Sequence, residues 1–195
     1  NNKSLKQTAR LFFITGITFW VFAIYWLVNV TLLGATILSL YLSLYFVVFG
    51  LAIYHSTKAS KPGVLFFIPS AWVVLEYARS HLLTGFPWAL LGYSQYLNLP
   101  GVQIADIFGV WGVSVLVIFS NVAIVEIIWL KKKSLLLRLK LTVAIITVIF
   151  FSALCYGFYR LSFLNSAEPS EKIKISVIQP NISQRLKWDP GARGF

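Results

Sequence analysis

The sequence predicts a mainly α-helical bundle that crosses a membrane about five times and is followed by the first strand of a further domain. Hydrophobic residues make up 58% of the 195 residues and charged residues 12%, whereas soluble domains have about 45–50% and about 25%. The apolar residues also gather into five stretches that are long enough, or nearly so, to cross a hydrocarbon core about 30 Å thick. Lipid rather than water is therefore expected to surround most of the chain.

Each stretch is expected to be a helix, because an open sheet leaves backbone groups unpaired in lipid. Residues 143–151 are apolar at successive positions, which argues against a barrel strand, where apolar and polar residues alternate. The first two spans cover 11–30 and 32–54, and Gly34 marks the turn that begins the second. The other three predicted spans are 64–83, which Glu76 and Arg79 interrupt, 102–130 and 135–159.

The basic residues predict how the helices are oriented. Before the first span and after the second and fourth lie ten of them: Lys3, Lys6, Arg10, Lys58, Lys61, Lys131, Lys132, Lys133, Arg138 and Lys140. The first link has no Lys or Arg, and the third has only Arg79. Because cytoplasmic loops carry the excess of Lys and Arg, we expect a cytoplasmic N-terminus and an extracytoplasmic segment after the fifth span.

The character of the sequence changes at the end of the helical domain, which is expected to cover 1–163. Residues 164–171 are polar and contain Pro169, which predicts a linker. Ile173, Ile175 and Val177 then alternate with polar residues, a pattern typical of a strand. Because one strand is not stable alone, we expect a domain that begins at 172–195 and continues beyond Phe195. The chain also starts with Asn1 and contains no Met, so we expect an internal piece of a longer protein.

The link that follows the third span is rich in aromatic residues and in residues that shape the backbone. Pro87 disfavours a helical conformation at Phe86, and Gly85 permits backbone angles that other residues avoid. We expect an aromatic loop that lies in the outer membrane interface beneath the soluble domain. The candidate interface residues are Gly85, Phe86, Pro87, Trp88, Tyr93 and Gln95. An ordinary belt of interfacial aromatic residues is the alternative.

Three further residues are candidates for the same site. Glu76 and Arg79 are three positions apart and share a helix face. Charged residues inside a membrane usually pair with one another or mark a site. They are therefore either an ion pair that braces the turn at 85–88 or a holder of a lipid headgroup or lipoprotein. Trp26, at the outer end of the first span, is either an aromatic anchor or part of an acyl-chain path.

Other functions are excluded or disfavoured. The net charge of +11 does not indicate nucleic-acid binding, because the basic residues lie in short clusters between apolar stretches and not in one stripe. Cys155 is expected to be a small buried residue and not a nucleophile, since Arg160, five residues on, is not on the same helix face. No group of residues has the spacing of metal ligands, and no cofactor is expected.

Four segments resemble, in the same order, the bacterial apolipoprotein N-acyltransferases. They are PSAWVVLEYARS (69–80), LTGFPWALLGYSQ (83–95), IADIFGVWGVSVLV (104–117) and VIQPNISQRLKWDP (177–190). The resemblance extends over nearly the whole chain. It implies an enzyme of the bacterial inner membrane with eight helices and a nitrilase-like α/β domain between the seventh and eighth. This chain would supply helices three to seven and the first nitrilase-like strand.

The resemblance also implies the chemistry. A Cys thiolate takes an acyl chain from a phospholipid as a thioester, and the N-terminal diacylglyceryl-cysteine of an apolipoprotein then accepts it. The implied Glu-Lys-Cys triad would lie beyond Phe195, so we expect these 195 residues to be inactive by themselves. The alternatives are another membrane-tethered nitrilase-like enzyme that forms amides and a non-enzymatic membrane scaffold or transporter-like protein.

Overall fold

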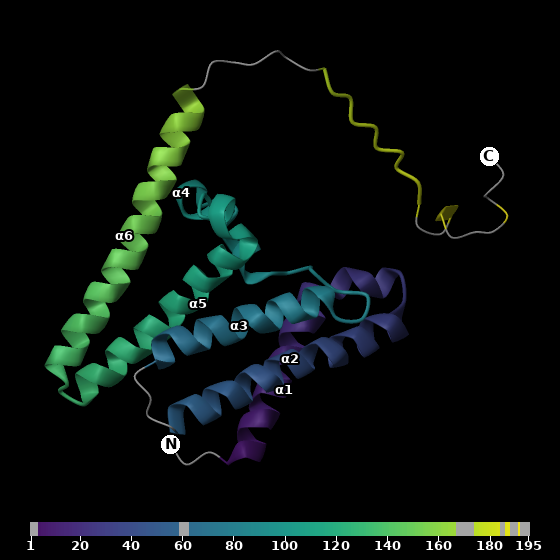
Figure 1. The fold of residues 1–195 in the computed structure, drawn as a ribbon. Helices are drawn as coiled ribbons and strands as arrows, with labels where there is room; N and C mark the ends of the chain where they lie inside the picture. The colour runs from purple at the N-terminus through teal and green to yellow at the C-terminus, as the bar shows by residue number, and fades with distance from the viewer. Residues whose placement is uncertain (1–3, 59–62, 167–173, 184–185, 188–190, 192–195) are drawn as a thin grey trace.

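A computed structural model describes residues 4–58, 63–166, 174–183, 186–187 and 191 (Figure 1). In these residues the chain forms six α-helices and two short 3-10 helices. The bounds are α1 Leu5–Ala23, η1 Tyr25–Asn29, α2 Leu32–Lys58, α3 Val64–His81, η2 Leu91–Gln95, α4 Leu99–Val102, α5 Ala105–Lys132 and α6 Leu136–Ser166. The prediction of a mainly helical chain is therefore confirmed.

Helices α1 and α2 form a close antiparallel pair. Glycines allow the close approach: a Cβ atom on Gly50 would lie 2.3 Å from the Phe12 ring, and one on Gly16 would lie 3.0 Å from the Ser43 backbone. Small residues play this part between membrane helices in general. The sequence predicts one span over 11–30, but α1 ends at Ala23 and the chain continues as η1.

Helix α3 packs between this pair and α5 (Figure 1). On the α5 side, Leu65 of α3 and Phe119 and Ala123 of α5 form a buried apolar cluster. At the other end of α3, Tyr77 contacts Trp111 with ring centroids 5.6 Å apart. Residues early in α3 thus meet residues late in α5, so these two helices are also antiparallel.

Helix α5 begins with a bend that turns its first residues toward α6. Gly109 has φ +63° and ψ −169°, which is outside the helical region. Asp106 lies before the bend and binds two α6 side chains. Its Oδ2 forms an ion pair with Arg160 Nε at 2.6 Å and accepts a hydrogen bond from the Tyr156 hydroxyl at 2.9 Å. Helix α6 packs on α5 and on the short α4.

Three helices are long and apolar enough to cross a membrane among the residues described. They are Leu32–Ser56, Ala105–Lys132 and Leu136–Leu164. Helices α1 and α3 do not meet that criterion, so the count of five spans is not confirmed. Both are long enough, with 19 and 18 residues, but each carries charged side chains that lower its mean hydropathy.

The ends of the helices alternate between two sides of the bundle. In Figure 1 the start of α1, the end of α2 and the turn between α5 and α6 lie toward the lower left. The 3-10 helix η1 and the loop after α3 lie on the opposite side. The basic residues Lys131, Lys132 and Lys133 belong to the first side.

The C-terminal part differs from the expectation in two ways. Helix α6 continues to Ser166, three residues into the predicted linker, and residues 167–173 lie outside the described residues. The predicted strand is not confirmed, because residues 174–183 carry no strand assignment. Val177 and Ile178 are 90% and 87% exposed. The physical reason is that the described residues contain no second strand to pair with this one.

Candidate functional site

The loop after α3 turns back into the helix bundle. The Leu82 amide donates to Ala78 O at 2.7 Å and the Phe86 amide donates to Arg79 O at 2.8 Å, so the chain reverses directly after α3. Gly85 makes this turn with φ +71°, and a Cβ atom there would lie 2.3 Å from Ser80 O. Only glycine fits both conditions without strain. We name residues 82–95 the re-entrant loop.

Arg79 holds the first half of the re-entrant loop by its backbone. Its Nη1 atom donates to the carbonyl oxygens of Phe86 and Trp88 at 2.8 and 2.7 Å. The guanidinium carbon lies 4.8 Å from the ring centre of Trp20, and the side chain is only 4% exposed. A buried guanidinium that donates to two carbonyls satisfies groups that lipid would leave unpaired.

Glu76 holds the second half of the re-entrant loop. Its Oε1 accepts a hydrogen bond from the Leu91 amide at 2.7 Å, and the side chain is 3% exposed. One position later, the Gly92 amide donates to Ser114 Oγ of α5 at 2.9 Å. Both halves of the loop are thus attached to buried side chains of α3 and α5.

Glu76 and Arg79 do not form the mutual ion pair that their spacing suggests. No nitrogen of Arg79 lies within 4.0 Å of a Glu76 carboxylate oxygen. Each side chain instead binds the main chain of the re-entrant loop. Sequence spacing places two residues on one helix face, but the returning loop supplies closer partners for both.

Aromatic rings cover the outer end of this arrangement. Phe86 packs edge-on against Trp20 with centroids 5.8 Å apart. Trp88 lies against Trp26 with centroids 5.2 Å apart, and both of these rings are partly exposed. The loop and the end of α1 therefore meet through two aromatic pairs.

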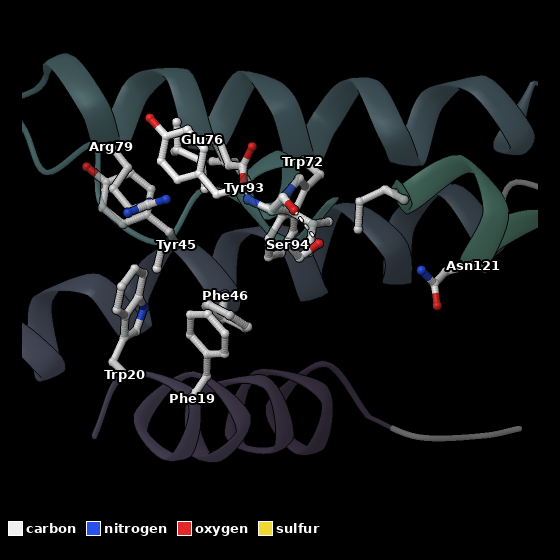
Figure 2. A pocket seen from close by; sticks show the side chains of 15 residues that line it. Phe19, Trp20, Tyr45, Phe46, Trp72, Glu76, Arg79, Tyr93, Ser94 and Asn121 are labelled. Atoms are coloured by element: carbon white, nitrogen blue, oxygen red, sulfur yellow. Dashed lines mark hydrogen bonds between the residues drawn. The ribbon is translucent and has the colours of Figure 1, made fainter. Parts of the chain in front are cut away.

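A cavity of about 620 Å³ lies beneath the re-entrant loop (Figure 2). Helices α1, α2, α3 and α5 and the loop itself contribute to its walls. We name it the lateral cavity. Its lining residues are Phe19, Trp20, Tyr45, Phe46, Trp72, Leu75, Glu76, Arg79, Ala89, Leu90, Leu91, Tyr93, Ser94, Ile118 and Asn121.

Three buried polar atoms in residues that line this cavity have no hydrogen-bond partner in the described part of the chain. They are Trp20 Nε1, Trp72 Nε1 and Glu76 Oε2. Buried polar atoms are nearly always paired in folded proteins, and ordered water or a bound molecule commonly accounts for the exceptions. The described residues around the lateral cavity therefore do not satisfy all of its buried polar atoms.

The structure brings together only some of the candidate residues. Glu76, Arg79 and Tyr93 line the lateral cavity. The loop residues Gly85, Phe86, Pro87 and Trp88 are not among its lining residues, and Phe86 and Trp88 are joined to it through the hydrogen bonds from Arg79. Gln95 points elsewhere, since its side chain bonds Ser94 and Asn98. Trp26 reaches the site only through Trp88.

Sequence reasoning missed several residues that line the lateral cavity. Trp72 precedes Glu76 by four positions and Arg79 by seven, which places all three on one helix face. That spacing would have identified Trp72. Trp20 and Tyr45 come from other helices, and nothing in the sequence connects them with Arg79.

The arrangement offers binding groups and apolar volume, not an activated nucleophile. The Ser94 hydroxyl donates to Leu91 O at 2.7 Å, and Cys155 is exposed on α6, away from the cavity lining. Cys155 was expected to be buried, and this expectation is wrong. Among the described residues, its helix packs only on α4 and α5, which leaves one side of it uncovered. Among the described residues, no three His, Cys, Asp or Glu side chains are grouped as metal ligands.

Comparison with known proteins identifies the relatives of this chain. Residues 1–123 match the family model described as the apolipoprotein N-acyltransferase N-terminal domain. The chain is 36% identical to the apolipoprotein N-acyltransferase of Geobacter metallireducens over 96% of its own length. It is 37% identical to that of Coxiella burnetii over 84%, and 32% identical to that of Haemophilus influenzae over 95%.

The chain is shorter than these relatives. It spans 38%, 32% and 36% of their lengths, respectively. No solved structure matches the chain. The re-entrant loop and every residue that lines the lateral cavity lie within the 1–123 match.

Proposed function

Because this chain belongs to the apolipoprotein N-acyltransferase family, we propose that the whole protein transfers an acyl chain from a phospholipid to the N-terminal diacylglyceryl-cysteine of lipoproteins. The observation that carries the proposal is the match to the family model over residues 1–123. Relatives 32–37% identical over most of this chain bear the same printed name. The phospholipid donor follows from the resemblance analysed above.

The proposed reaction has two half-reactions, both carried out by residues outside this chain. A cysteine thiolate attacks the ester carbonyl of the phospholipid, and the lysophospholipid leaves with a proton. The α-amino group of the lipoprotein cysteine then attacks the thioester, so an amide bond forms and the thiol is regenerated. A glutamate acts as the base and a lysine stabilises the oxyanion.

The described helices form the membrane platform in this proposal. We place the start of α1 and the α5–α6 turn in the cytoplasm, and the re-entrant loop at the outer face of a bacterial inner membrane. The basic residues at one end of the bundle support this orientation. We also propose that α1 and α3 cross the membrane with the other three long helices, since α3 buries its two charged side chains within the protein.

The proposal is tested with the whole protein, purified in detergent and mixed with phosphatidylethanolamine and a diacylglyceryl-cysteine lipopeptide. We expect mass spectrometry to show one added acyl chain on the lipopeptide and an equal amount of lysophospholipid. A lipopeptide with an acetylated α-amino group is the control and should not react. Absence of product, or product from the acetylated peptide, would contradict the proposal. Residues 1–195 alone are expected to give no product.

A further inference from the structure

The turn between α5 and α6 carries a dense group of positive charges. Five basic residues lie within ten positions of the sequence, and all five side chains are exposed: Lys131, Lys132, Lys133, Arg138 and Lys140. We name residues 131–140 the basic turn. Its charge has so far served only to orient the helices in the membrane, and it raises the question of what the turn binds.

The described residues supply no counter-charge to the basic turn. The part of the chain that the structure describes contains three acidic residues, Glu76, Asp106 and Glu126. Glu76 binds the re-entrant loop, and Asp106 binds Arg160. Glu126 lies on α5 ahead of the turn, and no described carboxylate oxygen lies within 4.0 Å of a basic nitrogen of the turn. The positive charge of the turn is therefore available to a partner outside these residues.

The helix dipoles explain only part of this charge. Lys131 and Lys132 occupy the last turn of α5, where the partial negative charge of a helix C-terminus attracts cations. Arg138 lies in the first turn of α6 and Lys140 in the second, and the first turn has no acidic residue. Because a helix N-terminus carries partial positive charge and unpaired amides, cations there are unfavourable without an anion. The second half of the basic turn therefore favours an anionic ligand.

The basic turn joins two helices that are suited to cross a membrane. The candidate spans are Ala105–Lys132 and Leu136–Leu164. Leu136 and Leu137, inside the turn, are exposed, and so is Trp129 just before it. Exposed aromatic and basic side chains at the end of a membrane helix are typical of the level of the lipid headgroups. The anions at this level of a membrane are the phosphate groups of its lipids.

We propose that the basic turn binds the headgroups of anionic phospholipids, such as phosphatidylglycerol, in the membrane leaflet that surrounds it. Basic clusters of this size beside a membrane helix bind anionic lipids in general. The binding is distinct from the orientation of the helices, because orientation is set when the chain inserts, whereas a bound lipid is an equilibrium property of the folded protein. The site rests on the membrane placement proposed above, but it does not require the acyl transfer.

Amide hydrogen exchange tests the site. The whole protein is placed in nanodiscs of phosphatidylcholine, with or without phosphatidylglycerol, and exchange is followed in peptides that cover residues 131–140. We expect phosphatidylglycerol to slow exchange in these peptides. Equal exchange in the two membranes would overturn the proposal. Inorganic phosphate added to the phosphatidylcholine nanodiscs should not slow exchange, and equal protection by free phosphate would overturn the assignment to a lipid.

A matched pair of double variants identifies the charges that are needed. Arg138→Gln with Lys140→Gln removes two charges of the turn and leaves its three lysines, which keep the orientation signal. Each basic residue near an anionic surface raises the affinity about fivefold, so we expect this variant to lose most of the protection. Lys174→Gln with Lys187→Gln removes the same charge at exposed positions elsewhere and should keep the protection. Equal protection in the two variants would overturn the proposal.

Two further measurements separate charge from folding and from apolar contact. Arg138→Lys with Lys140→Arg keeps the charge and should keep the protection, and loss of protection in this variant would overturn the proposal. Raising the NaCl concentration should weaken the protection, because salt screens exposed charges. Protection that salt leaves unchanged would show that the exposed leucines bind the membrane instead, and would also overturn it. Because the readout is local exchange and not turnover, an inactive enzyme leaves the result unchanged.

Discussion

Arg79 determines how the re-entrant loop is held, because its buried guanidinium donates hydrogen bonds to two loop carbonyls. A hydrogen bond to a charged group contributes about 1.5–3 kcal/mol, and a buried acceptor left unpaired costs about 1–3 kcal/mol. Its stacking on Trp20 ties the same side chain to α1. One residue thus joins α3, α1 and the loop.

Arg79→Met tests this role. The substitution keeps the length of the side chain and removes its donors, so the carbonyls of Phe86 and Trp88 lose their partner. We expect the protein to lose about 1–3 kcal/mol of stability for each unpaired carbonyl, measured as a lower midpoint of thermal unfolding in detergent. Arg138→Met is the control, since Arg138 is exposed at the start of α6. Similar midpoints in the two variants would contradict the role of Arg79.

Gly85→Ala tests the turn itself. The left-handed φ and the approach to Ser80 O both oppose a Cβ atom, so we expect a destabilisation of about 1–3 kcal/mol. Gly63→Ala is the matched control, because a Cβ atom on Gly63 meets nothing within 4 Å. The measurement is the difference between the two unfolding midpoints. If Gly85→Ala and Gly63→Ala have the same unfolding midpoint, the turn does not need glycine.

At the scale of elements, the bend in α5 determines which helices touch. Before Gly109, the chain leans toward α6, where Asp106 meets Arg160 and Tyr156. After it, the helix packs on α3 through Phe119 and Ala123. Asp106 lies in the first turn of α5, and its carboxylate is bound to another helix. The bend is what brings these two helices together.

Gly109→Ala tests the bend. Its φ of +63° with ψ of −169° lies in a region that is nearly restricted to glycine. In other residues this backbone conformation costs about 1–3 kcal/mol of strain. Space is not the obstacle, since a Cβ atom would lie 3.6 Å from its nearest neighbour, the Trp111 ring. We expect a lower unfolding midpoint than in the Gly63→Ala control. An unchanged midpoint would show that a Cβ atom at position 109 does not strain the bend.

At the scale of the whole molecule, the orientation in the membrane can be tested with single cysteines. Cys155 is first replaced by Ala, and Leu97→Cys and Lys133→Cys are then made separately, both at exposed positions. We expect a membrane-impermeant maleimide to label Leu97→Cys in intact spheroplasts, because that segment follows the re-entrant loop. Lys133→Cys should react only after permeabilisation. The reverse pattern would contradict the proposed orientation.

Much of the fold could be predicted from local sequence. The helix predicted over 64–83 is α3 at 64–81, and the fourth and fifth predicted spans correspond to α5 and α6 within a few residues, except that α6 extends to Ser166. The break of the first span at Ala23 was not foreseen. At this break, Trp20 and Ile24 are buried against Leu42 of the neighbouring helix, a contact that local sequence does not reveal.

The candidate site was predicted in part, for a related reason. The pair Glu76 and Arg79 stands out in sequence because charged residues are rare in membrane segments, and the loop residues stand out because Gly85 and Pro87 shape the backbone. Their partners do not stand out. The carbonyls that Arg79 binds belong to residues seven and nine positions away, and main-chain groups carry no sequence signal.

By itself, the sequence determined that the chain is helical and suited to a membrane, because in lipid each segment must satisfy its own backbone hydrogen bonds and composition alone reveals apolar segments. It also marked the loop as one of the segments that carry the resemblance to the family. Only the tertiary structure decided that this loop folds back into the bundle, that Glu76 and Arg79 hold it separately, and that a lateral cavity remains beneath it. These features depend on contacts between four helices whose approach is set by packing, and packing is not encoded in any one segment.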